Sequence, residues 1–471
     1  MGGKKFEDED ELIGEVRDWF SNLDANFFIQ GIYSLLPRTG NIFSIYFGGT
    51  LVIVLSGYDV LKEALVKQGD IFVDRPLQGL SGVVQVKNGI IGSSGSVWKE
   101  NRTSVFQIFK NFGLGKDVIS QKILEEVEFY LAYLKDLKGS VAYIQDITTC
   151  ATANVTCNVV LGKRFHYDDS DALCLIQSIS EYMTLVGGGR MHTWFSFVKY
   201  LPGDLFQSKR LMTLQEEILV KMRCFIENVK DEERKGLGSS NLILSSIEKL
   251  EEKQKTGQPT ELSMYHLERI VFDLILGGSE TTSTTLLWFY LYMVHFPDIQ
   301  DKFYNEIIRE IGTDRTPAGQ DKVRLTYVNA VILETQRLAT ISPFSILHRC
   351  SKETTIAGYT IPKDVQVLTH LDAVMLDDEI WGDARQFRPE RFLKEGKLFY
   401  PEQFVAFGLG KRSCPGESLA KMELFLFTVS LIQRFKIVPS DPNNLPIRDY
   451  VRGATCCPVP FTVKFVQRTD A

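Results

Sequence analysis

One stretch decides how this 471-residue chain is interpreted: Phe407-Gly408-Leu409-Gly410-Lys411-Arg412-Ser413-Cys414-Pro415-Gly416. It fits the pattern F-x-x-G-x-R-x-C-x-G at every fixed position, a match that rarely arises by chance. The glycines would let the backbone approach a flat macrocycle, the arginine can pair with a propionate, and the cysteine offers a soft anionic ligand. We therefore predict a heme held by the thiolate of Cys414. The alternative is an inert buried cysteine in a glycine-rich turn.

The residues beside the cysteine support a thiolate. Residues 417–433 have a helical pattern, and the N-terminus of such a helix would stabilise a negatively charged sulfur. Pro415 has no N–H, so one backbone donor to the sulfur is absent. We expect the thiolate to be more electron-rich, and the reduction potential lower, than in a Pro415→Leu variant.

Charged pairs at helical spacing occur twice. Glu334 and Arg337 lie three residues apart, on one helical face, and the segment Pro389-Glu390-Arg391-Phe392 follows before the cysteine loop. The same spacing at Glu306 and Arg309 lacks this context, and we expect only a solvated surface pair there.

A long apolar helix is predicted over residues 264–295, with polar residues gathered at 277–282. Gly277 and Gly278 each cost about 1 kcal/mol in a helix interior, so they call for an explanation. We expect that the helix passes close over an open iron face, and that the Thr281 hydroxyl bonds back to the Gly277 carbonyl. The alternative is a kinked core helix with no chemical role.

The rest of the chain predicts a mainly α fold with small β-sheets. Residues 41–46 and 51–55 are typical of a β-hairpin, and short strands are expected at 354–361 and 365–369. The other predicted helices cover 58–68, 116–136, 208–235, 297–311 and 325–340. The charged stretch 231–261 is expected to be an exposed connection around one short helix.

Composition narrows the function. The net charge of -6 gives no basic field, so nucleic acid is not an expected partner. Eight cysteines without zinc-type pairs are typical of reduced, intracellular thiols. Residues 1–34 are expected to be a polar segment without a membrane anchor or signal peptide, and 35–471 a single catalytic domain.

With these motifs, the chain resembles a cytochrome P450 from about Leu35 onward, and is most similar to the animal microsomal family-two enzymes. Stretches such as 57–60, 74–76 and 422–435 also suggest a position near the vitamin D hydroxylase branch. The resemblance implies the P450 fold, with heme b between the glycine-bearing helix and the cysteine-loop helix. Many relatives have Ala where this chain has Gly277.

The resemblance also assigns roles to residues. Cys414 would be the axial iron ligand, in a loop whose pattern positions are Phe407, Gly410, Arg412 and Gly416. The propionates would be held by Arg412, Trp98, Arg102 and His348. A buried network behind the loop would consist of Glu334, Arg337 and Arg391, and protons for oxygen activation would come from Glu280 and Thr281.

The implied activity is a monooxygenase that inserts one oxygen atom into an apolar substrate of the sterol, fatty acid or xenobiotic type. No dinucleotide-binding fingerprint is present, so the implied partners are NADPH-cytochrome P450 reductase and cytochrome b5. The implied location is the cytosolic face of the endoplasmic reticulum, with peripheral contacts through 27–29 and 194–195. The substrate cavity would be lined by 78–95, 183–212, the glycine-bearing helix and 341–347, with Phe344 near the heme.

Two other functions use the same cofactor. A heme-thiolate isomerase or dehydratase would act on a preformed peroxide, and relatives of this kind tend to lose the acid-threonine pair. A heme carrier without catalysis would bind ligands but consume no NADPH.

Overall fold

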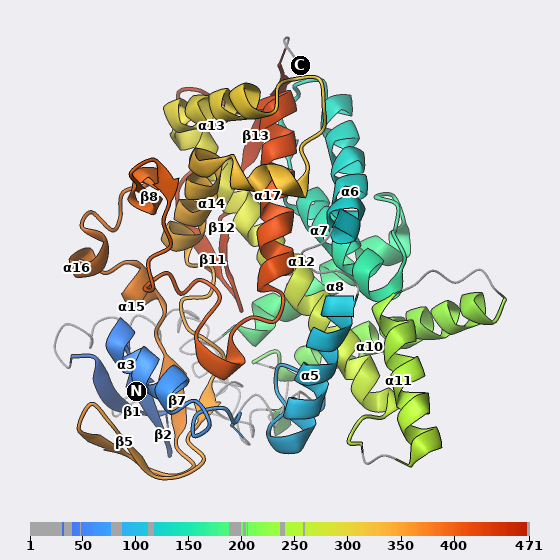
Figure 1. Ribbon diagram of the computed structural model, residues 1–471, viewed down its shortest axis with the longest axis vertical. Coiled ribbons are helices and arrows are strands. Elements are labelled where there is room, and N and C mark those ends of the chain that lie inside the picture. Colours follow the sequence, from blue (N-terminus) through green and yellow to red (C-terminus); the bar gives the residue numbers. More distant parts are fainter. Residues whose placement is uncertain are drawn as a thin grey trace, which may run out of the picture.

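The computed structural model describes residues 31–32, 40–47, 49–76, 87–111, 117–187, 199–200, 204, 206–235, 241–257 and 260–468. Figure 1 shows a mostly helical molecule, with the sheet that contains β1, β2 and β7 on one side of the helices. In the part described, no helix has both the length and the apolar character needed to cross a bilayer. The mainly α architecture with small sheets agrees with the prediction.

The α-helices are α3 (Tyr58–Lys62), α5 (Gly95–Asn111), α6 (Asp117–Asp136), α7 (Gln145–Leu161), α8 (Ser170–Val186), α10 (Ser208–Arg234), α11 (Leu242–Thr256), α12 (Met264–His295), α13 (Pro297–Glu310), α14 (Thr326–Ala339), α15 (Asp372–Met375), α16 (Asp378–Trp381) and α17 (Glu417–Arg434). Shorter turns of helix are η1 (Glu63–Lys67), η4 (Gly319–Val323), η5 (Pro389–Phe392) and η6 (Gly410–Arg412).

Most predicted helices are found within one residue of their expected ends. The segment 58–68 instead changes at Glu63 from an α-helix to the π-helical turn η1. The sequence pattern missed α7 and α8. Nearly every residue of α7 is buried, so its apolar residues follow no single face and leave no helical period to detect.

Helix α12 is the centre of the fold (Figure 1). The Ser263 side chain accepts a hydrogen bond from the His266 N–H and caps its start, and Pro297 begins α13 directly after it. Residues 284–294 are buried on all sides, against α6, α7, α13 and α17 in one large apolar cluster. This packing fixes α12 relative to the helix that follows the cysteine loop.

The strands are β1 (Ile42–Phe47), β2 (Thr50–Leu55), β3 (Ala142–Tyr143), β4 (His348–Arg349), β5 (Thr354–Ile356), β6 (Tyr359–Ile361), β7 (Gln366–Thr369), β8 (Leu393–Lys394), β9 (Lys397–Leu398), β10 (Phe435–Pro439), β11 (Tyr450–Arg452), β12 (Cys456–Pro458) and β13 (Thr462–Gln467). One sheet has the order β1-β2-β7-β4 and another β10-β13-β3; the remaining strands form two-stranded sheets. Strand β2 pairs with β7 in parallel, which joins the predicted hairpin to the strands after α14.

The prediction for Glu306 was wrong. Its side chain is only 6% exposed, and its carboxylate accepts hydrogen bonds from the Tyr327 and Val328 N–H groups at 3.1 and 2.8 Å. Glu306 therefore caps the N-terminus of α14, whereas Arg309 is 65% exposed and only touches its edge. Sequence spacing showed the pair but could not show that α14 begins beside it.

Candidate active site

The cysteine loop is a closed turn. The Cys414 N–H donates to the Phe407 carbonyl at 2.9 Å, and the Ser413 N–H donates to the Gly410 carbonyl at 3.1 Å. Gly410 has φ +70°, and a Cβ there would lie 1.9 Å from the Leu65 carbonyl oxygen. This glycine is therefore required by packing against η1, a reason that differs from the predicted approach to a macrocycle.

The Cys414 sulfur has opposing influences on its ionisation. Its side chain is solvent-accessible, yet the surrounding protein desolvates the sulfur enough to raise the pKa of the thiol. Hydrogen bonds from the backbone N–H groups of Gly416 and Glu417 act to lower that pKa, as does the charge of Arg102. The start of α17 thus supplies donors to the sulfur, and residue 415, being proline, cannot add another.

Three arginines gather above the loop. All three donate only to backbone carbonyl groups. Arg75 donates to Ile91, Ile346 and Leu347, and Arg102 donates to Ser413. Arg412 donates to Val73, Ile90 and Ser93. In the described part of the chain, none of the three lies within ion-pair distance of a carboxylate.

Burial and mutual repulsion lower the pKa of Arg412 to about 8, and burial with repulsion from Arg102 lowers that of Arg75 to about 9. Because guanidinium groups stay charged in proteins, these shifts indicate a positive field that favours an anion.

Two further predicted residues lie beside these arginines. The Arg412 guanidinium is 4.1 Å from the Trp98 ring centroid, and Trp98 Nε1 is buried without a hydrogen-bond partner in the described structure. His348 is buried and bonds through Nδ1 to the Phe72 carbonyl at 2.7 Å. Burial and the charge of Arg75 lower the pKa of His348 to about 3, so Nε2 becomes a donor only when a nearby anion favours the protonated ring.

The polar notch of α12 has the predicted backbone contact. Thr281 Oγ1 donates to the Gly277 carbonyl at 2.6 Å. The two glycines differ, because a Cβ at Gly277 would meet nothing within 4 Å, whereas one at Gly278 would lie 2.4 Å from Thr156 Oγ1 on α7. The expectation that both glycines open the helix toward the iron face is thus wrong for Gly278, which is needed for the packing of α12 on α7.

Glu280 is the acid of this notch. Its Oε1 accepts a hydrogen bond from Thr455 Oγ1 at 3.0 Å, and its Oε2 is buried without a partner in the described structure. Burial raises the pKa of Glu280 to about 7. The carboxyl group can therefore hold or release a proton near neutral pH.

The acid of α14 is surrounded by donors. Both Glu334 oxygens bond to Arg337, at 2.7 and 2.9 Å, and Oε1 also accepts from Arg391 Nε at 3.1 Å and from the Arg388 N–H at 2.9 Å. The side chains of Glu334 and Arg337 are fully buried. The structure thus contains the expected network, which connects α14 to η5 and the segment before the cysteine loop.

Comparison with known proteins identifies the family of the chain. The family model described as "Cytochrome P450" matches residues 25–465. The chain is 35% identical to "Cytochrome P450 2U1" of Mus musculus, over 91% of this chain and 81% of that protein. It is 33% identical to "Cytochrome P450 2J2" of Homo sapiens, with 93% and 86% covered, and 34% identical to "Cytochrome P450 2C23" of Rattus norvegicus, with 92% and 88% covered.

The chain belongs to the cytochrome P450 family. These relatives carry family-two names, as the resemblance implied, whereas a position near the vitamin D hydroxylase branch stays a prediction. This P450 is a heme-thiolate monooxygenase with heme b as its cofactor, and it acts on apolar organic substrates with electrons from a redox partner.

The residues of this P450 fit a heme. Two propionate groups need cations and hydrogen-bond donors that are not already paired. The arginines above the loop have no carboxylate within ion-pair distance in the described structure, and Trp98 Nε1 has no acceptor there. The Cys414 sulfur lies in the same loop as Arg412 and receives donors from the start of α17, as a thiolate ligand requires. Arg75 adds a buried cation to this set.

Sequence reasoning missed two residues of the site. Arg75 lies in the stretch 74–76, which the sequence connects only with the family resemblance, and its position between Asp74 and Pro76 is the one local signal. Asp273, one turn before Gly277, accepts hydrogen bonds from the Ile90 and Ile91 N–H groups at 2.6 and 2.8 Å. Asp273 thereby connects α12 to residues 90–93, whose carbonyl groups accept hydrogen bonds from the arginines. No local sequence pattern predicts this contact.

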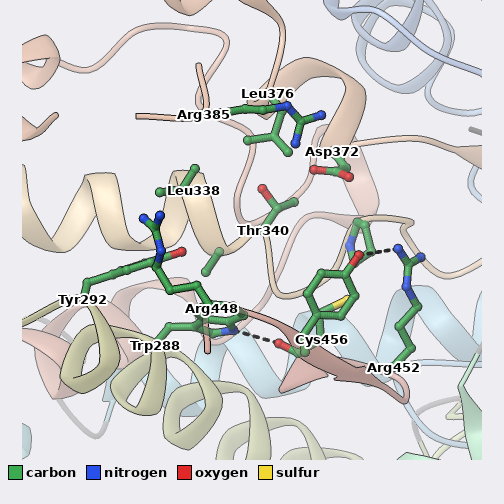
Figure 2. A pocket seen from close by; sticks show the side chains of 13 residues that line it. Trp288, Tyr292, Leu338, Thr340, Asp372, Leu376, Arg385, Arg448, Arg452 and Cys456 are labelled. Atoms are coloured by element: carbon green, nitrogen blue, oxygen red, sulfur yellow. Dashed lines mark hydrogen bonds between the residues drawn. The ribbon is translucent and has the colours of Figure 1, made fainter. Parts of the chain in front are cut away.

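A separate pocket of about 760 Å³ lies between α12, the end of α14 and the β11–β12 hairpin (Figure 2). Arg385, Arg448 and Arg452 line it, as does Pro343 from the predicted cavity segment 341–347. None of the residues predicted to bind heme or to deliver protons lines it. Much of the predicted substrate cavity, including most of 78–86 and 188–203, lies outside the described residues, as do 27–29 and 194–195. Phe344 stacks on His370 with ring centroids 4.5 Å apart, and its predicted proximity to the heme stays a prediction.

Proposed function

We propose that Cys414 is the axial ligand of this P450 and that Arg412, Trp98, Arg102 and His348 hold the heme propionates, with Phe407, Gly410 and Gly416 shaping the loop. The observation that carries this proposal is the group of arginines above the loop that lack carboxylate partners in the part of the chain described. An uncompensated cation is costly in a protein interior, so this arrangement favours a dianionic ligand.

Heme, when bound, supplies electron transfer and the activation of oxygen. We propose that the chain contributes protons through Glu280 and Thr281. Thr281 Oγ1 is anchored to the Gly277 carbonyl at 2.6 Å, which orients the hydroxyl oxygen at the notch of α12. Glu280 Oε2 makes no hydrogen bond to the described protein atoms, so it is free to carry a proton. Because the pKa of Glu280 is raised to about 7, the carboxyl group can bind and release that proton near neutral pH.

We propose a structural role for Glu334, Arg337 and Arg391, which would hold the segment before the cysteine loop. Arg337 also donates to the Met375 and Ala384 carbonyl groups at 2.7 and 2.6 Å, so the network crosslinks α15 and the chain after α16. Residues 35–471 would form the single catalytic domain. Ile32 already packs in the cluster that contains Phe43 and Phe47, so a boundary at residue 34 needs a truncation series to test it.

We infer that the electrons come from NADPH-cytochrome P450 reductase, with cytochrome b5 as a second partner, at the cytosolic face of the endoplasmic reticulum. Exposed aromatic side chains support a peripheral membrane contact, because Tyr46 and Tyr200 are 70% and 79% exposed and tyrosine favours membrane interfaces. Recovery of the intact protein in the microsomal fraction is expected, and full recovery in the soluble fraction after mild lysis would contradict this location.

The decisive experiment is a carbon monoxide difference spectrum of the dithionite-reduced protein. A strongly red-shifted Soret band is expected for the natural chain, and its loss is expected in Cys414→Ser because a neutral hydroxyl cannot replace the thiolate. Cys174→Ser changes an exposed cysteine and serves as the matched control. A heme spectrum without the shift in the natural protein would contradict ligation by Cys414.

Turnover separates the possible reactions. With reductase and NADPH, one atom of labelled oxygen gas should enter the product. An isomerase or dehydratase would convert a lipid hydroperoxide without reductase, and a carrier would bind heme yet do neither. The acid-threonine pair Glu280-Thr281 is present and supports the first outcome.

A further inference from the structure

The acid proposed to deliver protons is held by a residue from a distant part of the chain. Thr455 lies between β11 and β12, and its Oγ1 donates to Glu280 Oε1 at 3.0 Å across a sequence separation of 175 residues. Thr455 is only 4% exposed. The contact is partly buried, so bulk water weakens it less than it would weaken a hydrogen bond at the surface.

The backbone around Thr455 is fixed on both sides. The Ala454 N–H donates to the Met183 carbonyl at 2.8 Å, and the Cys456 N–H donates to the Ile341 carbonyl at 2.7 Å. Figure 2 shows the third anchor, in which Trp288 Nε1 donates to the Cys456 carbonyl at 2.9 Å. Since Trp288 and Glu280 both belong to α12, the hairpin is attached to the same helix whose acid Thr455 contacts.

The two oxygens of Glu280 differ as a result. Oε1 is held by Thr455, whereas the buried Oε2 makes no hydrogen bond to the described protein atoms. Without the threonine the carboxyl group could rotate, because the terminal torsion of a glutamate side chain is broad. The neighbouring titratable group is Cys457, whose thiol has a pKa raised to about 12 by burial and by the charge of Glu280, so it stays neutral and does not compete for protons.

We propose that Thr455 is a positioning residue for Glu280: its hydroxyl holds Oε1 and thereby orients Oε2 for proton transfer at the notch of α12. The inference rests on the proposed proton-delivery role of Glu280. A threonine that only stabilised the hairpin would not need to contact the acid, because the backbone anchors of Ala454 and Cys456 already hold that segment.

The test compares Thr455→Val, which keeps the shape and removes the donor, with Thr455→Ser, which keeps the donor. Each variant is assayed with saturating reductase for steady-state NADPH oxidation in ordinary and deuterated water, after the red-shifted carbon monoxide spectrum has verified heme ligation. Loss of one hydrogen bond should slow Thr455→Val by about fivefold and increase its solvent isotope effect. Thr455→Ser should stay within about twofold of the natural chain, since its hydroxyl can form the same bond.

Two further variants complete the design. Thr462 lies on β13, and its hydroxyl donates to Ser440 Oγ at 3.0 Å. Thr462→Val removes this hydroxyl and should leave the rate of NADPH oxidation and the solvent isotope effect unchanged. In a Glu280→Gln background, Thr455→Val should add little, because residues acting through one group are not additive. Thr455→Ala replaces the valine variant if the latter fails to bind heme.

The outcomes distinguish a failure of the positioning role of Thr455 from a failure of proton delivery by Glu280. If Glu280→Gln is slow but Thr455→Val matches the natural chain, the positioning role is wrong while proton delivery by Glu280 stands. Equal slowing in the valine and serine variants, or additive slowing in the Glu280→Gln background, would mean that Thr455 acts only structurally. If Glu280→Gln itself is as fast as the natural chain, the proposed proton-delivery role fails, and the positioning role fails with it.

Discussion

Two glutamates of this P450, the fully buried Glu334 and the half-buried Glu280, differ in how completely they are paired. Glu334 on α14 accepts four hydrogen bonds, three of them from the guanidinium groups of Arg337 and Arg391. Glu280 on α12 accepts one, from Thr455, and leaves Oε2 without a partner in the described structure. Complete pairing stabilises a charge and prevents proton exchange, whereas incomplete pairing leaves a carboxyl group able to change protonation. The difference separates a structural acid from a reactive one.

The largest expected effect is the loss of the paired acid. Glu334→Ala would leave Arg337 as a buried charge without a carboxylate and Arg391 with only the half-exposed Asp383. Such a change costs about 3 to 5 kcal/mol. We expect little folded, heme-containing protein, measured by heme content and thermal unfolding. Glu390→Ala, in the same turn as Arg391 but with a side chain 49% exposed, is the control and should behave like the natural protein. Normal heme content in Glu334→Ala would remove the contrast between the two acids.

The unpaired acid should affect turnover and leave the fold intact. Glu280→Gln is expected to bind heme normally and to slow NADPH-supported turnover by about 100-fold, the usual scale of general acid catalysis. In the natural protein, turnover limited by proton delivery should fall as pH rises through about 7, because the carboxyl group loses its proton there. The pH profile of Glu280→Gln should lack this step, and a profile unchanged from the natural protein would contradict the assignment.

The raised pKa of Glu280 also makes folding stability depend on pH, in the direction opposite to that of a carboxylate in a salt bridge. Because the folded state holds the Glu280 proton more tightly than the unfolded chain, its contribution to stability is present at low pH and lost as pH rises from about 4.5 through about 7. In Glu280→Gln the unfolding temperature should change less between pH 4.5 and 7 than in the natural protein, as measured by thermal scans at several pH values.

The two glycines of α12 offer a smaller, matched comparison. Gly278→Ala would place a Cβ 2.4 Å from Thr156 Oγ1 and should cost about 1 to 3 kcal/mol through overpacking between α12 and α7. Gly277→Ala would meet no protein atom within 4 Å and should be neutral, or stabilising by up to about 1 kcal/mol. Thermal unfolding of both variants tests the difference, and equal effects would contradict it.

The smallest expected effect concerns the sulfur. Pro415→Leu restores an N–H beside Cys414, and one more donor makes a thiolate less electron-rich. The reduction potential should be higher in Pro415→Leu than in the natural protein, by redox titration of both. No difference, or the opposite order, would mean that the donors at Gly416 and Glu417 already determine the sulfur's electronic state.

The sequence by itself determined the cysteine loop, the helix α12 to the residue, the spacing of Glu334 and Arg337, and membership of the P450 family, because these are properties of consecutive residues. Tertiary structure decided which acids are paired. Glu306 had the same spacing as Glu334 but caps α14, and Gly278 serves the contact with α7. Arg75, Asp273 and Thr455 join the site through contacts between distant segments, and such contacts depend on how the helices and the hairpin pack, which no local pattern records.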